Sequence, residues 1–209
     1  LKALGIRLLT NWRGEGYSRD GNLVTAIHGR EIVSTDLILV GIGAIPNTHL
    51  AQAAGIACAN GVLTDATLAT NKPHVWAIGD VACTPHWQTG QAERIESVQN
   101  ATDQARHLAR SLAQGVTKPF RSVPWFWSDI GSLKLQIAGL SSGADHQIIR
   151  QDGAKLAIYH LRQGQLISVE TVGCAADHMI ARRLLDVGLT PTEQQIMAGP
   201  VQLKAMLSS

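Results

Sequence analysis

The sequence has few cysteines and no histidine pair at metal-binding spacing. These absences argue against a dithiol redox site and against a metal site. The three cysteines, Cys58, Cys83 and Cys174, are too far apart to form a CxxC dithiol or a zinc knuckle. The eight histidines show neither HxxH nor HExxH spacing, so we predict no metal site. A net charge of +2 gives no reason to expect a nucleic-acid partner.

Long hydrophobic runs are also missing. The longest extends from Leu37 to Pro46, about half of the roughly 20 residues that a membrane-spanning helix needs. No charged segment followed by an apolar one opens the chain, so we expect a cytoplasmic protein with no membrane partner. The sequence begins with Leu1 inside what looks like structured chain, and we expect it to be part of a longer protein.

The first part of the chain has the pattern of an α/β protein. We predict strands at residues 5–10, 23–28 and 37–40. The last of these is continuously apolar, which is typical of a parallel strand covered on both faces. Thr48 is predicted to cap a short helix that ends at Gly55.

The stretch VWAIGD, residues 75–80, indicates a buried strand that ends on a carboxylate. Open parallel sheets bind ligands at the carboxyl edge of their strands. Gly79 would allow a ligand to approach closely, and Asp80 would accept a hydrogen bond from a ligand hydroxyl. The alternative is that Asp80 only caps a turn or helix.

A long helix is predicted after this strand, ending at Gly115. Apolar residues recur at steps of three and four and form one face: Val98, Ala101, Ala105, Leu108 and Leu112. Glu96, just before this run, is either a solvated carboxylate or an acceptor for a ligand.

The second part of the chain has the pattern of an α+β protein. From residue 123 onward, short strands alternate with hairpin-like turns, which indicates an antiparallel sheet. These strands are predicted at residues 133–139, 146–150, 156–162 and 166–173. A helix follows at about 176–187, and Thr190 to Glu193 form a predicted capping box with proline at the first helical position. The sequence therefore predicts α/β followed by α+β, with a boundary close to residue 120.

Two further motifs leave alternatives open. Gly41 and Gly43 lack the third glycine of GxGxxG, so they do not form a nucleotide fingerprint, although a turn that admits a ligand is possible. Trp125 and Trp127 lie on the same side of any extended segment. They would serve either a core or interface, or the edge of a flat cofactor.

Four stretches together resemble the FAD-dependent ferredoxin reductases of bacterial oxygenase systems, of the putidaredoxin and rubredoxin reductase type. They are TDLILVGIGAIPN, LATNKPHVWAIGD, RIESVQNATDQAR and VPWFWSDIGSLKLQIAGL. The resemblance covers nearly the whole chain, in matching order. It implies the closing part of a doubly wound FAD/NAD(P)-binding fold, followed by a C-terminal reductase domain. The implied boundaries are 1–45 for the end of the NAD(P) domain, 46–120 for part of the FAD domain and 121–209 for the reductase domain.

The resemblance also implies roles for individual residues. Gly79 and Asp80 would bind the ribityl part of FAD, and the backbone at Val98 would meet the flavin ring. The other implied contacts are Ser97 and Trp127 with FAD, and Gly43 and Glu96 with NAD(P). No side chain here need act as a nucleophile or general base.

The implied activity is electron transfer from NAD(P)H through FAD to a 2Fe-2S ferredoxin or a rubredoxin, which supplies a cytochrome P450 or a dioxygenase. One alternative is a disulfide reductase or NADH oxidase of the same superfamily, although no histidine here is followed by glutamate five residues later. The other is a truncated chain that binds no FAD and is inactive, because the segments that carry the nucleotide-binding GxGxxG motifs of the family are not in this sequence.

Overall fold

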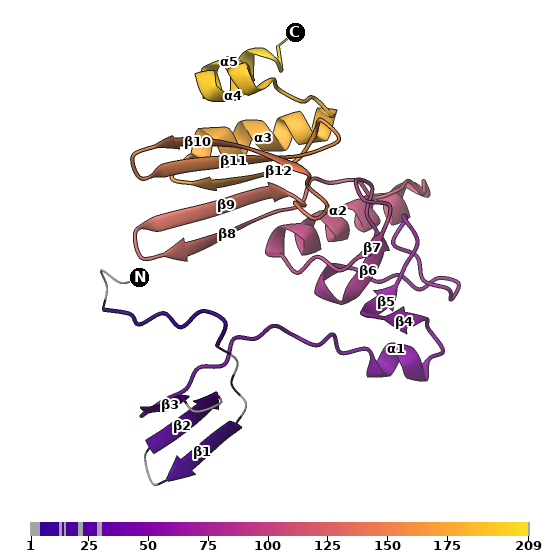
Figure 1. The fold of residues 1–209 in the computed structure, drawn as a ribbon. Helices are drawn as coiled ribbons and strands as arrows, with labels where there is room; N and C mark the ends of the chain where they lie inside the picture. The colour runs from indigo at the N-terminus through magenta and orange to yellow at the C-terminus, as the bar shows by residue number, and fades with distance from the viewer. Residues whose placement is uncertain (1–4, 13, 15, 21–22, 29–30, 209) are drawn as a thin grey trace. The chain divides into compact units, whose positions relative to one another are not determined.

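The computed structural model describes residues 5–208 except 13, 15, 21–22 and 29–30. The chain divides into two compact units, Leu1–Ile45 and Pro46–Ser209 (Figure 1).

The first unit contains an antiparallel sheet of strands β1 (Gly16–Asp20), β2 (Leu23–His28) and β3 (Glu31–Thr35), in the order β1-β2-β3. The predicted strand at 23–28 is confirmed as β2. Residues 5–10 form no strand, so that prediction was wrong. β1 and β3 were not predicted.

The strand predicted at residues 37–40 is also wrong. This segment has no strand pairing, and it is exposed rather than covered, with Leu39 87% accessible to solvent. A parallel strand forms only when neighbouring strands supply its hydrogen bonds. Within the described part of this unit, the antiparallel sheet is the only sheet, and residues 37–40 do not join it.

The second unit begins with α1 (His49–Ala53) and a small mixed sheet. Thr48 precedes α1 as predicted, but its side chain makes no capping hydrogen bond. The sheet has the order β4-β5-β6-β7 and one parallel pair, β5 with β6. Its strands are β4 (Cys58–Ala59), β5 (Gly61–Leu63), β6 (Ala82–Pro85) and β7 (Ala92–Glu93).

A long helix, α2 (Val98–Gln114), follows this sheet and ends at Gly115, which adopts the left-handed conformation at φ +64°. The helix was predicted, and its burial pattern adds a feature that the apolar spacing did not indicate. Its buried residues are Asn100 and Gln104, whereas Val98 and Leu112 are 73% and 54% exposed. Ala101 and Leu108 on the apolar face are half-buried, and η2 (Gly79–Val81) packs near Ala101, but only polar side chains of the helix are fully buried.

The remaining strands form a five-stranded antiparallel sheet in the order β10-β11-β12-β9-β8. The strands are β8 (Trp125–Ile130), β9 (Leu133–Gly139), β10 (His146–Asp152), β11 (Lys155–Arg162) and β12 (Gln165–Val172). All four predicted strands are confirmed. β9 ends at Gly139, where an added Cβ would lie 2.1 Å from the Ile167 carbonyl oxygen and φ is +77°. Only glycine fits this approach of two backbones.

Helices α3 (Ala175–Val187) and α4 (Glu193–Ala198) cover one face of this sheet, and α5 (Pro200–Ala205) packs against these two helices (Figure 1). α3 agrees with the prediction and ends at Gly188. The predicted capping box is displaced by two residues, because Thr192 caps α4 together with Gln195. Pro191 therefore lies before the cap and not at the first helical position.

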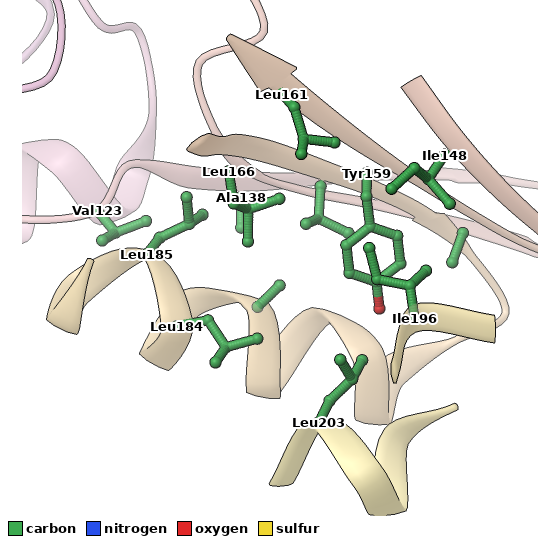
Figure 2. Close-up of a cluster of buried hydrophobic side chains, with 13 residues drawn as sticks. Val123, Ala138, Ile148, Tyr159, Leu161, Leu166, Leu184, Leu185, Ile196 and Leu203 are labelled. Carbon is green, nitrogen blue, oxygen red and sulfur yellow. The ribbon is translucent and has the colours of Figure 1, made fainter. Parts of the chain in front are cut away.

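The main core lies between the sheet and these helices (Figure 2). Tyr159, Val169, Leu184, Ile196 and Leu203 are fully buried there. At roughly 25 cal/mol per Å² of apolar surface, each fully buried aliphatic side chain contributes about 2 kcal/mol.

A buried polar network crosses the same core. Tyr159 on β11 donates from its hydroxyl to Asp177 Oδ1 on α3 at 2.7 Å, and Arg150 on β10 binds the same carboxylate oxygen. Arg150 also donates to the Ile196 carbonyl oxygen in α4 at 2.7 Å. Burial raises the pKa of Tyr159 well above its usual range, helped by the bond to Asp177. The network therefore joins two strands to two helices.

Candidate functional site

The Gly79–Asp80 turn lies within a short 3-10 helix, η2 (Gly79–Val81). Residues 75–78 form no strand, so the strand predicted to end on Asp80 was wrong. Their backbone instead closes local turns, with Ala77 N–H donating to the Leu68 carbonyl at 3.1 Å. The neighbouring strand, β6, begins after Asp80 rather than before it.

Gly79 is buried and is held against α2. Its N–H donates to Gln104 Oε1 at 2.6 Å, and its φ of +73° favours glycine. Asp80, the next residue, is exposed, so its carboxylate is available to a ligand. The turn therefore has a fixed backbone and an accessible acceptor.

Arg94 connects this turn to the segment before α2. Its guanidinium donates to the Asp80 carbonyl oxygen at 3.1 Å and pairs with the Glu96 carboxylate. It also donates to Asn60 Oδ1 at 3.3 Å. Glu96 is therefore an exposed carboxylate that is oriented by a cation. Arg94 was not predicted as a site residue.

Gly61 is needed for this arrangement. An added Cβ would lie 2.5 Å from the Val81 carbonyl oxygen and 3.0 Å from Arg94 Cδ, at a φ of +114°. A larger residue would push apart β5 and the end of η2, where Arg94 packs.

The N-terminus of α2 lies next to Glu96. Ser97 is its N-cap, and the Ser97 hydroxyl accepts a hydrogen bond from Asn100 N–H at 3.0 Å. The N–H groups of Val98 and Gln99 have no protein acceptor among the described residues. Such N–H groups, together with the helix dipole, favour negative charge at this end of the helix.

Trp127 lies on β8, and the residue is 45% exposed. Trp125 and Trp127 do share one side of the strand, with ring centroids 5.5 Å apart. The Trp125 ring is contacted edge-on by His178 and lies 4.4 Å from the Arg182 guanidinium carbon. The partly exposed Trp127 ring is thus supported from behind by a packed group.

These observations bring five of the seven predicted residues together. Gly79, Asp80, Glu96, Ser97 and Val98 are joined through Gln104 and Arg94. Trp127 is linked to α2 less directly, because Ser122, which precedes β8, donates to Asp103 Oδ2 at 3.0 Å. Gly43 lies in the first unit, in an exposed segment with φ of +97° and open space where a side chain would be.

Gln104 and Arg94 are the site residues that the sequence did not indicate. Gln104 lies among the other polar residues of α2, and nothing in its spacing separates a buried amide from a solvated one. The only signal for Arg94 is that it stands two residues before Glu96, where side chains of an extended segment share a side.

The described residues contain neither a metal cluster nor a membrane-spanning helix. Across the described residues, no group of three or more histidine, cysteine, aspartate or glutamate side chains could hold a metal ion. In the same residues, every helix is too short or too polar to cross a membrane.

Comparison with known protein families identifies both parts of the chain. Residues 1–105 match the pyridine nucleotide-disulphide oxidoreductase family, and residues 125–207 match the reductase C-terminal family. The chain is 39% identical over 180 residues to rhodocoxin reductase of Rhodococcus erythropolis, covering 85% of this chain and 42% of that protein. It is 32% identical over 209 residues to putidaredoxin reductase of Pseudomonas putida, covering 98% of this chain and 49% of that protein.

Solved structures agree with this comparison. A ferredoxin reductase from Rhodopseudomonas palustris superposes with a TM-score of 0.92 at 38% identity, over 98% of this chain and 52% of that one. This agreement confirms α/β followed by α+β as the fold class. The chain spans about half the length of the relatives it matches. With its two parts in the order found in ferredoxin reductases, the chain belongs to the pyridine nucleotide-disulphide oxidoreductase family.

Proposed function

We propose that this chain is the C-terminal portion of an NAD(P)H-dependent flavoprotein reductase. Its acceptor would be a 2Fe-2S ferredoxin or a rubredoxin that serves a cytochrome P450 or a dioxygenase. The observation that carries the proposal is the Gly79–Asp80 turn, held against α2 by the 2.6 Å bond from Gly79 N–H to Gln104. The names of the relatives, which include rhodocoxin reductase and putidaredoxin reductase, support the same activity.

The chemistry of the site suits FAD. Asp80 offers an exposed carboxylate for the ribityl hydroxyl groups, and the neighbouring Gly79 holds the turn with a left-handed φ of +73°. The N–H groups that open α2, at Val98 and beside Ser97, would stabilise negative charge on the flavin ring. FAD, when bound, accepts a hydride from NAD(P)H and releases electrons to one-electron acceptors.

We assign the remaining residues by the same reasoning. Trp127 would cover the flavin on the side that faces the acceptor, since its ring is exposed on one side and packed on the other. Glu96, oriented by Arg94, and Gly43 would face NAD(P)H. The boundaries 1–45, 46–120 and 121–209 for the NAD(P), FAD and reductase segments belong to this proposal. So does a cytoplasmic location, because the three free cysteines suit a reducing compartment.

FAD binding tests the proposal. When FAD is added to the purified 209-residue chain and unbound flavin is removed, we expect bound flavin in the visible spectrum. Asp80→Ala should weaken binding about tenfold, through loss of charge-assisted hydrogen bonds. Asp152→Ala, which removes an exposed carboxylate on β10, is the control and should bind FAD as the unaltered chain does. Equal binding by both variants would contradict the role of Asp80.

The partner side is tested separately, in the complete reductase. Trp127→Ala should slow electron transfer to the iron–sulfur protein more than it slows flavin reduction by NADH. Stopped-flow absorbance measures both steps. If neither step changes, Trp127 does not have the proposed role.

A further inference from the structure

A basic pocket of about 400 Å³ lies outside the proposed FAD site. It is formed by α3 and the segment that leads into β8. Its lining residues are Arg121, Ser122, Val123, Met179, Arg182, Arg183 and Asp186. Three guanidinium groups therefore share the pocket with a single carboxylate.

Arg121 is fixed on one side of this pocket. Its guanidinium carbon lies 4.4 Å from the centre of the Trp87 ring, and one of its nitrogens donates to the Asp186 carbonyl oxygen at 2.7 Å. A guanidinium carries five N–H donors, so these contacts leave donors for another acceptor. The side chain is held in place without its charge being neutralised.

Arg182, which also lines the pocket, is stacked on a second aromatic ring. Its guanidinium carbon lies 4.4 Å from the centre of the Trp125 ring. Burial lowers the pKa of Arg182, partly opposed by the charge of Asp103. No carboxylate of the described residues lies within ion-pairing distance of Arg182 or of the neighbouring Arg183, which is exposed.

The acidic groups near the pocket do not neutralise its three guanidinium groups. Asp103 accepts hydrogen bonds from Gln99 at 2.8 Å and from Ser122 at 3.0 Å. Asp186 is the only carboxylate that lines the pocket. The pocket therefore keeps an excess of positive charge, and guanidinium groups fixed by aromatic stacking lose little entropy when they bind an anion.

We propose that this pocket binds a phosphate group. Planar guanidinium donors match the oxygen geometry of phosphate, and a doubly charged anion balances the excess charge better than a carboxylate does. The volume also exceeds that of one phosphate, which leaves room for an organic group attached to it. This inference does not depend on the proposed reductase activity.

Isothermal titration calorimetry of the 209-residue chain, at constant ionic strength, tests the inference. The probes are inorganic phosphate, glycerol 3-phosphate and acetate. We expect saturable binding of phosphate with one site per chain, and much weaker binding of acetate. Tighter binding of glycerol 3-phosphate than of inorganic phosphate would support a phosphate ester as the ligand, and equal binding would support free phosphate.

Three variants locate the site. Arg121→Gln and Arg183→Gln should each weaken phosphate binding about tenfold, as expected for loss of a hydrogen bond to a charged group. Arg110→Gln, on the exposed side of α2 and outside the pocket, should leave it unchanged. Absence of saturable phosphate binding, acetate binding as tight as phosphate, or an equal loss in the Arg110 variant would overturn the proposal. Circular dichroism of each variant checks that the fold is retained.

Discussion

Residues 121–209 and residues 46–120 differ in what they bury. The first group packs thirteen buried hydrophobic residues between a five-stranded sheet and three helices. In the second group, the longest helix buries Asn100 and Gln104 and exposes Val98 and Leu112. Both groups contain buried polar side chains. The buried residues of α2 are all polar, whereas those of α3 include Ala181, Leu184 and Leu185.

This difference in burial suggests that residues 121–209 provide stability and that residues 46–120 provide the binding surface. Residues 121–209 form a stable scaffold, because their hydrophobic groups are buried by neighbours from the same group. Residues 46–120 keep Asp80 and the start of α2 accessible and hold them through hydrogen bonds to Gln104 and Arg94. We therefore expect substitutions in the first group to change stability, and substitutions on the exposed face of the second to change binding.

The largest loss of stability should come from Asp177→Ala. This substitution leaves the Arg150 charge without its carboxylate partner and removes the acceptor of the Tyr159 hydroxyl. We expect the free energy of unfolding to fall by about 3–5 kcal/mol. Urea denaturation followed by circular dichroism measures the change. Asp152→Ala serves as the control, and a similar loss in both variants would mean that the network does not stabilise the scaffold.

A smaller loss should accompany acidification. Burial, with a contribution from Arg182, lowers the pKa of His178 from 6.5 to about 4. Neither ring nitrogen of His178 has a hydrogen-bond partner among the described residues. The unfolded chain therefore takes up a proton at a higher pH than the folded chain does. Stability present above pH 6.5 is lost as the pH falls toward 4, by about 3 kcal/mol for this residue.

His178→Phe should remove much of this pH dependence, because phenylalanine does not titrate. The buried His86, whose pKa is also lowered to about 4 by burial, should keep the rest. Urea denaturation at several pH values measures the slope, with His49→Gln, an exposed histidine, as the control. A slope unchanged by His178→Phe would show that His178 is not the group that titrates.

The smallest effect is expected at Leu112. Its side chain is 54% exposed on α2, so Leu112→Gln should change the free energy of unfolding by less than about 0.5 kcal/mol. Leu184→Ala in the buried core should cost about 2–5 kcal/mol in the same assay. If Leu112→Gln were as costly as Leu184→Ala, Leu112 would contribute to packing in spite of its exposure.

The two groups also differ in how far the sequence predicted them. Strands β9 to β12 and helix α3 were predicted because each strand has a hairpin partner close in the sequence and the turns and apolar patterns are local. Strands predicted at 37–40 and 75–78 were wrong, because a parallel strand depends on partners far away in the sequence. These segments are rich in apolar residues, but an apolar composition does not determine which strand, if any, a segment pairs with.

The candidate site was predicted only in part for a related reason. The glycine–aspartate turn and the start of α2 were visible as motifs, whereas the contacts of Gln104 and Arg94 depend on tertiary packing. The capping box shows the same limit. Thr190 and Thr192 both fit the pattern, but the Thr190 hydroxyl accepts a hydrogen bond from Leu166 N–H at 2.9 Å, which leaves Thr192 to cap α4.

Titration of the 209-residue chain with FAD, followed residue by residue through backbone amide NMR shifts, tests whether residues 46–120 bind the cofactor. We predict that the largest shifts occur at Gly79 and Asp80 and at Ser97 to Gln99, the groups placed at the flavin site. Amides of β10 and β11 should change little. Shifts concentrated in β10 and β11, or no shifts at Gly79 and Asp80 at high FAD concentration, would contradict the assignment of residues 46–120 as the FAD-binding segment.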